Sequence, residues 1–278
     1  MVNMDEPWDS RRILILGMTY PHYSKKYREN VCTGGLFADT CEMVRIHPIP
    51  RRYMDDNQRF GSFQWITAKV MKHPSDPRPE SYRVHPESIE LQEKIPPKEG
   101  RKRFELLRKS PHLCRSVEEL KDRWERDRTS LGVVQPKEIL GCHLKHRSAQ
   151  ERAEWNEKEQ QLLAQTELPF ERPIRRIDFP EVRFMVQWVC DDPRCPSHEM
   201  GILTWGLHEL YRRYRGREDC EEKILQSMRQ RLDTSKQELF LFLGNYRDKM
   251  HNFGLMDSYS CQKNYLEQPK QPTLPGLD

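Results

Sequence analysis

The sequence lacks the motifs of the common nucleotide-dependent and hydrolytic enzymes. It contains no phosphate-binding Gly-Lys-Ser/Thr loop and no glycine-rich dinucleotide fingerprint after a strand. A His-Glu-x-x-His helix, a Gly-x-Ser-x-Gly elbow and the His-x-Glu with Pro-Cys-x-x-Cys signature of zinc deaminases are absent too. These absences argue against those enzyme classes, although they leave room for an enzyme of another kind.

Long apolar runs are also missing. No run approaches the ~18 residues that span a bilayer, and the polar, acidic start Met1–Ser10 is unlike a signal peptide. We therefore expect a cytoplasmic protein that does not enter a membrane. The eight cysteines are scattered over 278 residues, too long a chain for a small disulfide scaffold. In a reducing compartment they are expected to be buried thiols, metal ligands or a nucleophile.

The composition is polar for a folded protein. Hydrophobic residues make up 36% and charged residues 32% of the chain, and the mean hydropathy is −0.93. The hydrophobic share still lies above that of disordered chains, so we expect a folded protein with much charged, solvated helix or linker. The net charge of +4 and the pI near 8.6 permit a nucleic-acid partner without requiring one.

The order of the patterns predicts an α+β fold that begins with a β-barrel-like domain over residues 10–95. Apolar or alternating segments at Arg11–Gly17, Met43–Ile49 and Phe63–Met71 are typical of strands. Short connections rich in proline and glycine separate them. Closely spaced short strands of this kind favour a small barrel or a curled sheet.

The rest of the chain divides into a charged, mainly helical connecting region (96–168), an α+β module (169–261) and a disordered tail (262–278). Ser116 and Glu119 form the pattern of a capping box at a helix start. Residues 131–146 have an extended pattern, and we leave open whether they pair with the first sheet. The module combines a regularly alternating strand, Glu181–Cys190, with two amphipathic helices and a hairpin.

The most specific chemical feature lies between that strand and the next helical pattern. Cys190, Cys195 and His198 fall within nine residues around a turn-forming Asp-Asp-Pro. Thiolates and imidazoles are the preferred ligands of zinc, so this run predicts a zinc knuckle. The alternative is two buried thiols at a strand end with a surface histidine beside them.

A structural zinc site needs four ligands, and this run supplies three. We take His208 as the fourth ligand; Cys220, Cys142 and His143 are rivals. Three protein ligands alone would suit a catalytic zinc that keeps a water. Because no neighbouring glutamate is marked out as a base, we favour a structural zinc.

Basic residues are concentrated in the N-terminal region. Residues 11–83 contain 13 Lys or Arg against 7 Asp or Glu. Basic side chains beside aromatics on a small barrel suit phosphate neutralisation and base stacking. We therefore predict a nucleic-acid-associated protein that binds mainly the phosphate backbone, although an ordinary basic surface would look the same. The candidate contact residues are Lys25, Lys26, Tyr27, Arg45, Arg51, Arg52 and Arg78.

Two other functional classes stay open. Cys32 precedes Gly34-Gly35, where substrate could approach the backbone, and a cationic setting would activate its thiol. An enzyme acting on a nucleotide or nucleic acid, with its site near Cys32, Arg45 and Arg78, is therefore the alternative, but the sequence identifies no catalytic residue. The third class is a scaffold that binds another protein through its charged middle helices.

The C-terminal tail carries one short resemblance. Gln271 is followed three residues later by Leu274 within the segment Gln271–Leu277. This resembles the peptides by which bacterial DNA-repair proteins dock on the replication sliding clamp, in which the Gln contacts a pocket rim and apolar residues fill the pocket. The usual terminal Leu-Phe pair is replaced here by Leu274-Pro275. The resemblance implies a clamp as partner and DNA as the nucleic acid.

Overall fold

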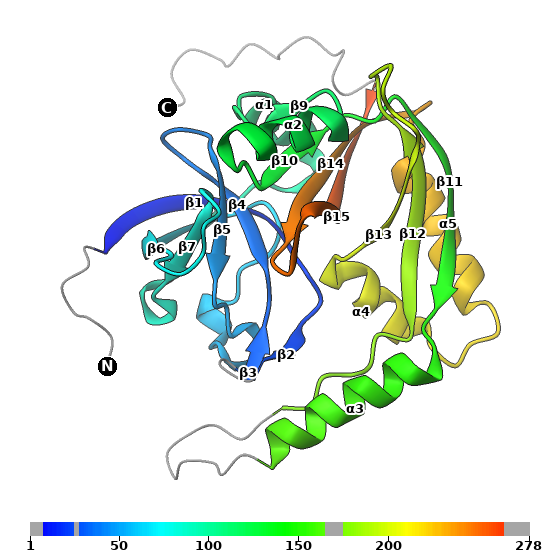
Figure 1. Cartoon of the computed structure of the whole chain (residues 1–278), viewed down its shortest axis with the longest axis horizontal. Helices are drawn as coiled ribbons and strands as arrows, with labels where there is room; N and C mark the ends of the chain where they lie inside the picture. Colours follow the sequence, from blue (N-terminus) through cyan, green and yellow to red (C-terminus); the bar gives the residue numbers. More distant parts are fainter. Residues whose placement is uncertain (1–7, 25–27, 165–174, 264–278) are drawn as a thin grey trace.

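The computed structural model describes residues 8–24, 28–164 and 175–263, and it shows the expected mixed α+β architecture (Figure 1). A β-barrel occupies the N-terminal part, and a seven-stranded sheet with helices occupies the C-terminal part. Within these residues no helix is long and apolar enough to cross a membrane.

Five strands close the barrel, and a sixth strand extends it. Strand β1 pairs with β4 on one side and with β6 on the other, while β4 pairs with β5, β5 with β7 and β7 with β6. The β5–β7 contact is parallel and the others are antiparallel. This order is the Greek-key connectivity of the OB-fold. The strands are β1 (Asp9–Met18), β4 (Thr33–Phe37), β5 (Met43–His47), β6 (Gln64–Lys72), β7 (Ser81–Val84) and the additional β8 (Glu90–Lys94).

The C-terminal sheet repeats the same connectivity in an open form. Strands β11, β12 and β13 are joined in series, two helices follow, and β15 lies between β13, to which it is parallel, and β14. Strand β10 pairs with the edge of β14 that faces away from β15. In a closed barrel of this connectivity that edge would pair with the first strand, β11. The strands are β9 (Leu113–Cys114), β10 (Leu131–Val134), β11 (Glu138–His146), β12 (Val182–Val189), β13 (His198–Ile202), β14 (Gln237–Tyr246) and β15 (Lys249–Gln262).

Residues 131–146, whose pairing the sequence left open, belong to this second sheet and not to the first. β10 pairs with β14 and β9, and β11 pairs with β12 along nearly its whole length. The alternation predicted for β12 is confirmed, since Val182, Phe184, Val186 and Trp188 are fully buried in one core.

Within the described residues, five α-helices complete the fold. They are α1 (Gly100–Arg108), α2 (Val117–Asp127), α3 (Ala149–Leu163), α4 (Trp205–Tyr214) and α5 (Cys220–Leu232). α3 carries a capping box at Ser148 and packs its Trp155 against Tyr23 in the short hairpin of β2 (His22–Ser24) and β3 (Arg28–Asn30). In Figure 1, α3 runs beneath the rest of the chain, and α5 lies beside β11.

The two halves share one hydrophobic core. Leu14 and Leu16 of β1 point out of the barrel and pack with Phe240, Phe242 and other residues of the C-terminal sheet. The contact is closest where the ring of Phe242 meets the backbone of Gly34, because a Cβ atom at Gly34 would overlap that ring. Glycine at this position lets the barrel wall approach the second sheet.

This contact gives a test of the packing. Gly34→Ala should lower the free energy of unfolding by about 1–3 kcal/mol, as overpacking of a core does, measured by urea denaturation. Gly141→Ala is the matched control, since a Cβ there meets nothing within 4 Å, and it should change stability by less than about 0.5 kcal/mol. Equal stabilities for the two variants would contradict the close approach.

Candidate ligand pocket and metal centre

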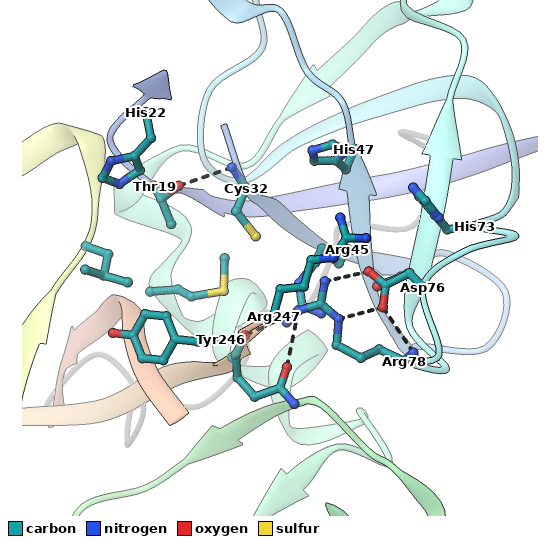
Figure 2. A pocket seen from close by; sticks show the side chains of 15 residues that line it. Thr19, His22, Cys32, Arg45, His47, His73, Asp76, Arg78, Tyr246 and Arg247 are labelled. Atoms are coloured by element: carbon teal, nitrogen blue, oxygen red, sulfur yellow. Dashed lines mark hydrogen bonds and ion pairs between the residues drawn. The ribbon is translucent and has the colours of Figure 1, made fainter. Parts of the chain in front are cut away.

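A cavity of about 240 Å³ lies where the barrel meets the C-terminal sheet. The barrel contributes the connection between β1 and β4, strand β5, and the connection between β6 and β7. The second half contributes Leu203, Met256 and the β14–β15 turn. In OB-folds these same barrel segments, the second and third strands with the first and last connections, form the ligand-binding face. Figure 2 shows the lining side chains.

Arg78 is fixed at one side of the cavity by a two-point ion pair. Its Nε and Nη2 donate to the two carboxylate oxygens of Asp76 at 2.8 and 2.5 Å, and its Nη1 lies 3.3 Å from Oδ1 of Asn245 in the second half. Burial alone would raise the pKa of Asp76, but the hydrogen bonds from Arg78 outweigh it and hold that pKa well below the usual range. Arg78 therefore keeps a fixed direction toward the cavity (Figure 2).

Arg45 is the most enclosed cation of the cavity, at 4% exposure. Its Nη1 donates to Oγ of Ser130 at 3.1 Å, and that hydroxyl in turn donates to Glu80 at 2.7 Å. Burial lowers the pKa of Arg45, but a guanidinium stays charged in proteins. Its buried Nε has no hydrogen-bond partner within residues 8–24, 28–164 and 175–263. An enclosed donor without a partner is unfavourable, and it marks a position that a ligand could satisfy.

Neutral histidines and a thiol complete the lining. Burial, together with the neighbouring His73, lowers the pKa of His47 to about 4, so this ring is uncharged at pH 7. Cys32 is partly buried, and its N–H donates to Oγ1 of Thr19 at 3.1 Å. The exposed Arg247 lines the cavity as well. Three guanidinium groups against the single lining carboxylate of Asp76 give the cavity a positive charge.

The second site is a cluster of metal-ligating groups beneath the turn from β12 to β13. Glu118, Cys190, Cys195 and His198 each offer one ligand atom, and these atoms lie within 4.8 Å of one another. Nε2 of His198 is 3.3 Å from Sγ of Cys195 and 3.4 Å from Oε1 of Glu118. This set of buried or half-buried groups could hold a metal ion.

Local structure explains how Glu118 reaches the turn. Ser116 is the N-cap of α2 and accepts the N–H of Glu119, as expected. The same hydroxyl donates to Asp192 at 2.8 Å, and Asp192 closes the cysteine turn by accepting the N–H of Arg194. The first turn of α2 is thus fixed to the cysteine turn. The two carboxylate oxygens of Glu118 are buried and make no regular hydrogen bond among the described residues, although Nε2 of His198 lies 3.4 Å from Oε1.

Comparison with known families assigns the chain to a family, but the family description names no activity. A family model described as Domain of unknown function (DUF8757) matches residues 113–273, more than half of the chain. The chain belongs to this family. A second model, Domain of unknown function (DUF8758), matches residues 9–109. No curated protein matches the chain.

The structure replaces His208 as the fourth member of the metal cluster. Its ring packs 4.4 Å from Tyr20 and 4.9 Å from Phe184, measured between ring centroids, and it is not among the clustered groups. Burial lowers the pKa of His208 to about 3, so it is a neutral packing residue at pH 7. The helix containing His208 directs this side chain toward Tyr20 and Phe184 instead of toward the cysteine turn. Cys220, Cys142 and His143 lie outside the cluster as well.

The residues predicted to contact nucleic acid lie in different places in the structure. Arg45 and Arg78 meet in the cavity. Arg51 packs over the ring of Phe60, and Arg52 pairs with Glu29 at 2.6 Å. The remaining three predicted contacts, Lys25, Lys26 and Tyr27, lie outside the described residues, as does the tail Gln271–Leu277.

Sequence reasoning missed Glu118, Asn245 and Arg247. Glu118 stands 72 positions before Cys190, and the other two belong to a hairpin turn more than 160 residues after Arg78. No spacing pattern connects such distant positions, so only the tertiary fold brings them to the sites.

Proposed function

We propose that the protein is a nucleic-acid-associated protein, with DNA as the preferred nucleic acid, and that it binds a phosphate group in the cavity between barrel and sheet. The observation that supports this most is the excess of guanidinium groups in a cavity on the ligand-binding face of an OB-type barrel. The contact would be concentrated in this cavity, since neither Arg51 nor Arg52 lines it: Arg52 pairs with Glu29 and Arg51 packs over the ring of Phe60.

The chemistry of the lining suits a phosphate. Guanidinium groups match phosphate oxygens with two parallel hydrogen bonds. Arg45 offers its unpartnered Nε, and Asp76 holds Arg78 in place without neutralising the other two arginines. Arg247, on the β14–β15 turn, would contact the strand at the cavity mouth. Binding of this kind releases counterions and weakens with rising salt.

Arg247 allows a test that spares the core. We expect Arg247→Ala to weaken binding of a labelled single-stranded DNA oligonucleotide and to reduce the slope of log K against log salt by about one, measured by fluorescence anisotropy over a salt series. Lys249→Ala is the control, because Lys249 is exposed on the same hairpin but does not line the cavity. Absence of binding by the wild type, an affinity indifferent to salt, or equal effects of the two variants would contradict the proposal.

We further propose that the clustered ligands bind a structural zinc ion. Two thiolates, one imidazole and one carboxylate are a tetrahedral donor set that zinc accepts, and four protein ligands leave no open position for substrate. The buried carboxylate of Glu118, which makes no regular hydrogen bond among the described residues, would be satisfied by the ion. The metal would join α2 to the β12–β13 turn, and its binding free energy would stabilise the C-terminal module.

Metal analysis tests this assignment. Purified wild-type protein should contain one zinc per chain by mass spectrometry, and Cys195→Ser and Glu118→Ala should each lose most of it. Cys142→Ser and His208→Phe should retain the metal, because neither residue belongs to the cluster. A chelator should lower the melting temperature of the wild type but not of Cys195→Ser. Zinc lost in His208→Phe and kept in Glu118→Ala would overturn the assignment.

A second candidate is an enzyme that acts on a nucleotide or nucleic acid in the same cavity. The observation that favours it is the common location of Cys32, Arg45 and Arg78 in one enclosed cavity, with the neutral His47 beside them. A neutral histidine can accept a thiol proton, and guanidinium groups can bind the substrate phosphate. Cys32 would be the nucleophile in this case.

This candidate predicts turnover. Wild-type protein incubated with a labelled oligonucleotide or nucleoside triphosphates should yield a new product by chromatography, and Cys32→Ser should abolish the product while it retains binding. Cys41→Ser, a partly buried cysteine outside the cavity, is the control. Product formation that persists in Cys32→Ser would exclude the thiol as nucleophile, and binding without any product would leave only the first proposal.

A further inference from the structure

A second cavity, of about 410 Å³, lies on the other side of the wall that bounds the first. Leu203 and Met256 line the first cavity, and the next residues along the chain, Thr204 and Asp257, line the second. Successive residues of an extended chain point to opposite faces, so the two cavities lie back to back. The second cavity is a separate site from the one assigned to phosphate binding above.

The floor of this cavity carries a polar group that nothing in the described chain satisfies. Tyr259 is 6% exposed and lines the cavity, and its hydroxyl has no hydrogen-bond partner among the described residues. Beside it, Asp257 accepts from Oγ1 of Thr204 at 3.0 Å and from the N–H of Ser258 at 2.8 Å. Burial raises the pKa of Asp257 and that of Tyr259. The hydroxyl of Tyr259 is therefore a neutral group with an unused hydrogen bond.

One end of the cavity is suited to an anion. Trp205 and Gly206, the first residues of α4, line it. Thr204 is the N-cap of this helix, but its side chain makes no capping bond and serves Asp257 instead. The first-turn N–H groups and the helix dipole at this end favour negative charge. Arg231, half exposed at the rim, adds a cation. It donates to the carbonyl of Ser258 at 2.8 Å and lies 3.9 Å from Oδ1 of Asp257.

The opposite wall is mainly apolar. Met18, Phe63 and Phe104 line it, and the guanidinium of Arg103 lies over the ring of Phe63 at 4.1 Å from its centroid. Phe63 has a positive φ of 56°, a conformation that a bulky residue adopts only when its surroundings enforce it. This conformation is held by two backbone hydrogen bonds, to Ile15 and from Ile95.

We infer that this second cavity binds a mononucleotide. Its phosphate would lie at the start of α4 beside Arg231, and its base would stack along Met18 and the guanidinium of Arg103, which covers the ring of Phe63. The polar edge of the base would meet Tyr259 and Asp257. Anion-binding groups, an aromatic wall and unused hydrogen-bonding capacity in one cavity match the three parts of such a ligand. This inference does not depend on nucleic-acid binding in the first cavity.

Calorimetric titration with AMP, GMP, CMP and UMP tests the inference on the full chain. At least one of them should bind the wild type. Tyr259→Phe, which removes only the hydroxyl, should weaken that binding about three- to tenfold, and Arg231→Ala should weaken it at least about tenfold, as loss of a charged contact does. Arg229→Ala is the control, since Arg229 is exposed on the same helix and does not line the cavity.

Three results would overturn the inference. The first is that none of the four nucleotides binds the wild type, and the second is that binding is unchanged in both Tyr259→Phe and Arg231→Ala. The third is that Arg247→Ala abolishes nucleotide binding while these two variants keep it, which would assign the nucleotide to the first cavity. Loss of oligonucleotide binding in Arg247→Ala with nucleotide binding intact would support two independent sites. Folding of Tyr259→Phe is verified by thermal denaturation, and removal of an unpartnered buried hydroxyl should not lower its stability.

Discussion

Strand β1 belongs to two hydrophobic cores at once, and the rest of the architecture depends on this. Ile13 and Ile15 point into the barrel, whereas Leu14 and Leu16 point outward into the core shared with the C-terminal sheet, and all four are fully buried. A barrel strand normally has one face toward solvent and alternates with polar residues. Because β1 has no solvent face in this region, the barrel cannot leave the second sheet without exposing Leu14 and Leu16. The two halves are therefore fixed against each other, and both cavities lie along this fixed seam.

The seam also contains charge, which apolar packing alone does not require. Arg45 reaches Ser130 and Glu80, and Arg78 reaches Asp76 and Asn245, so each network joins the barrel to the second half. Enclosing the Arg78–Asp76 ion pair gives little net stability, since desolvation offsets most of the attraction. Unlike apolar side chains, the fixed guanidinium groups of Arg45 and Arg78 create a positive potential inside the cavity. The proposed phosphate binding would use this potential.

The sequence predicted the local parts of this structure well and the long-range parts poorly. Strand β12 and the cap at Ser116 follow from short patterns, because alternation and capping depend on neighbours within a few residues. The cysteine turn brings Cys190, Cys195 and His198 together for the same reason. Glu118 could not be predicted, because its partners in the cluster follow it in the sequence by 72 residues or more, beyond α3. The extended pattern of residues 131–146 was compatible with pairing to either sheet. The sequence also did not predict that the C-terminal sheet has the same strand connectivity as the barrel. Connectivity depends on which strands pair, and the two halves show no recognisable sequence repeat.

The metal cluster and the cavities are joined by one short strand. His198, a member of the cluster, is the first residue of β13, and the strand ends four residues later at Ile202. Leu203 and Thr204 follow at once and form the wall between the two cavities. The wall is attached to the barrel by the N–H of Tyr20, which donates to Leu203. An ion bound by His198 would therefore fix one end of β13, and the barrel fixes the other end. The proposed structural metal would thus stabilise the C-terminal module and also hold the shape of both cavities, although none of its ligands lines either cavity.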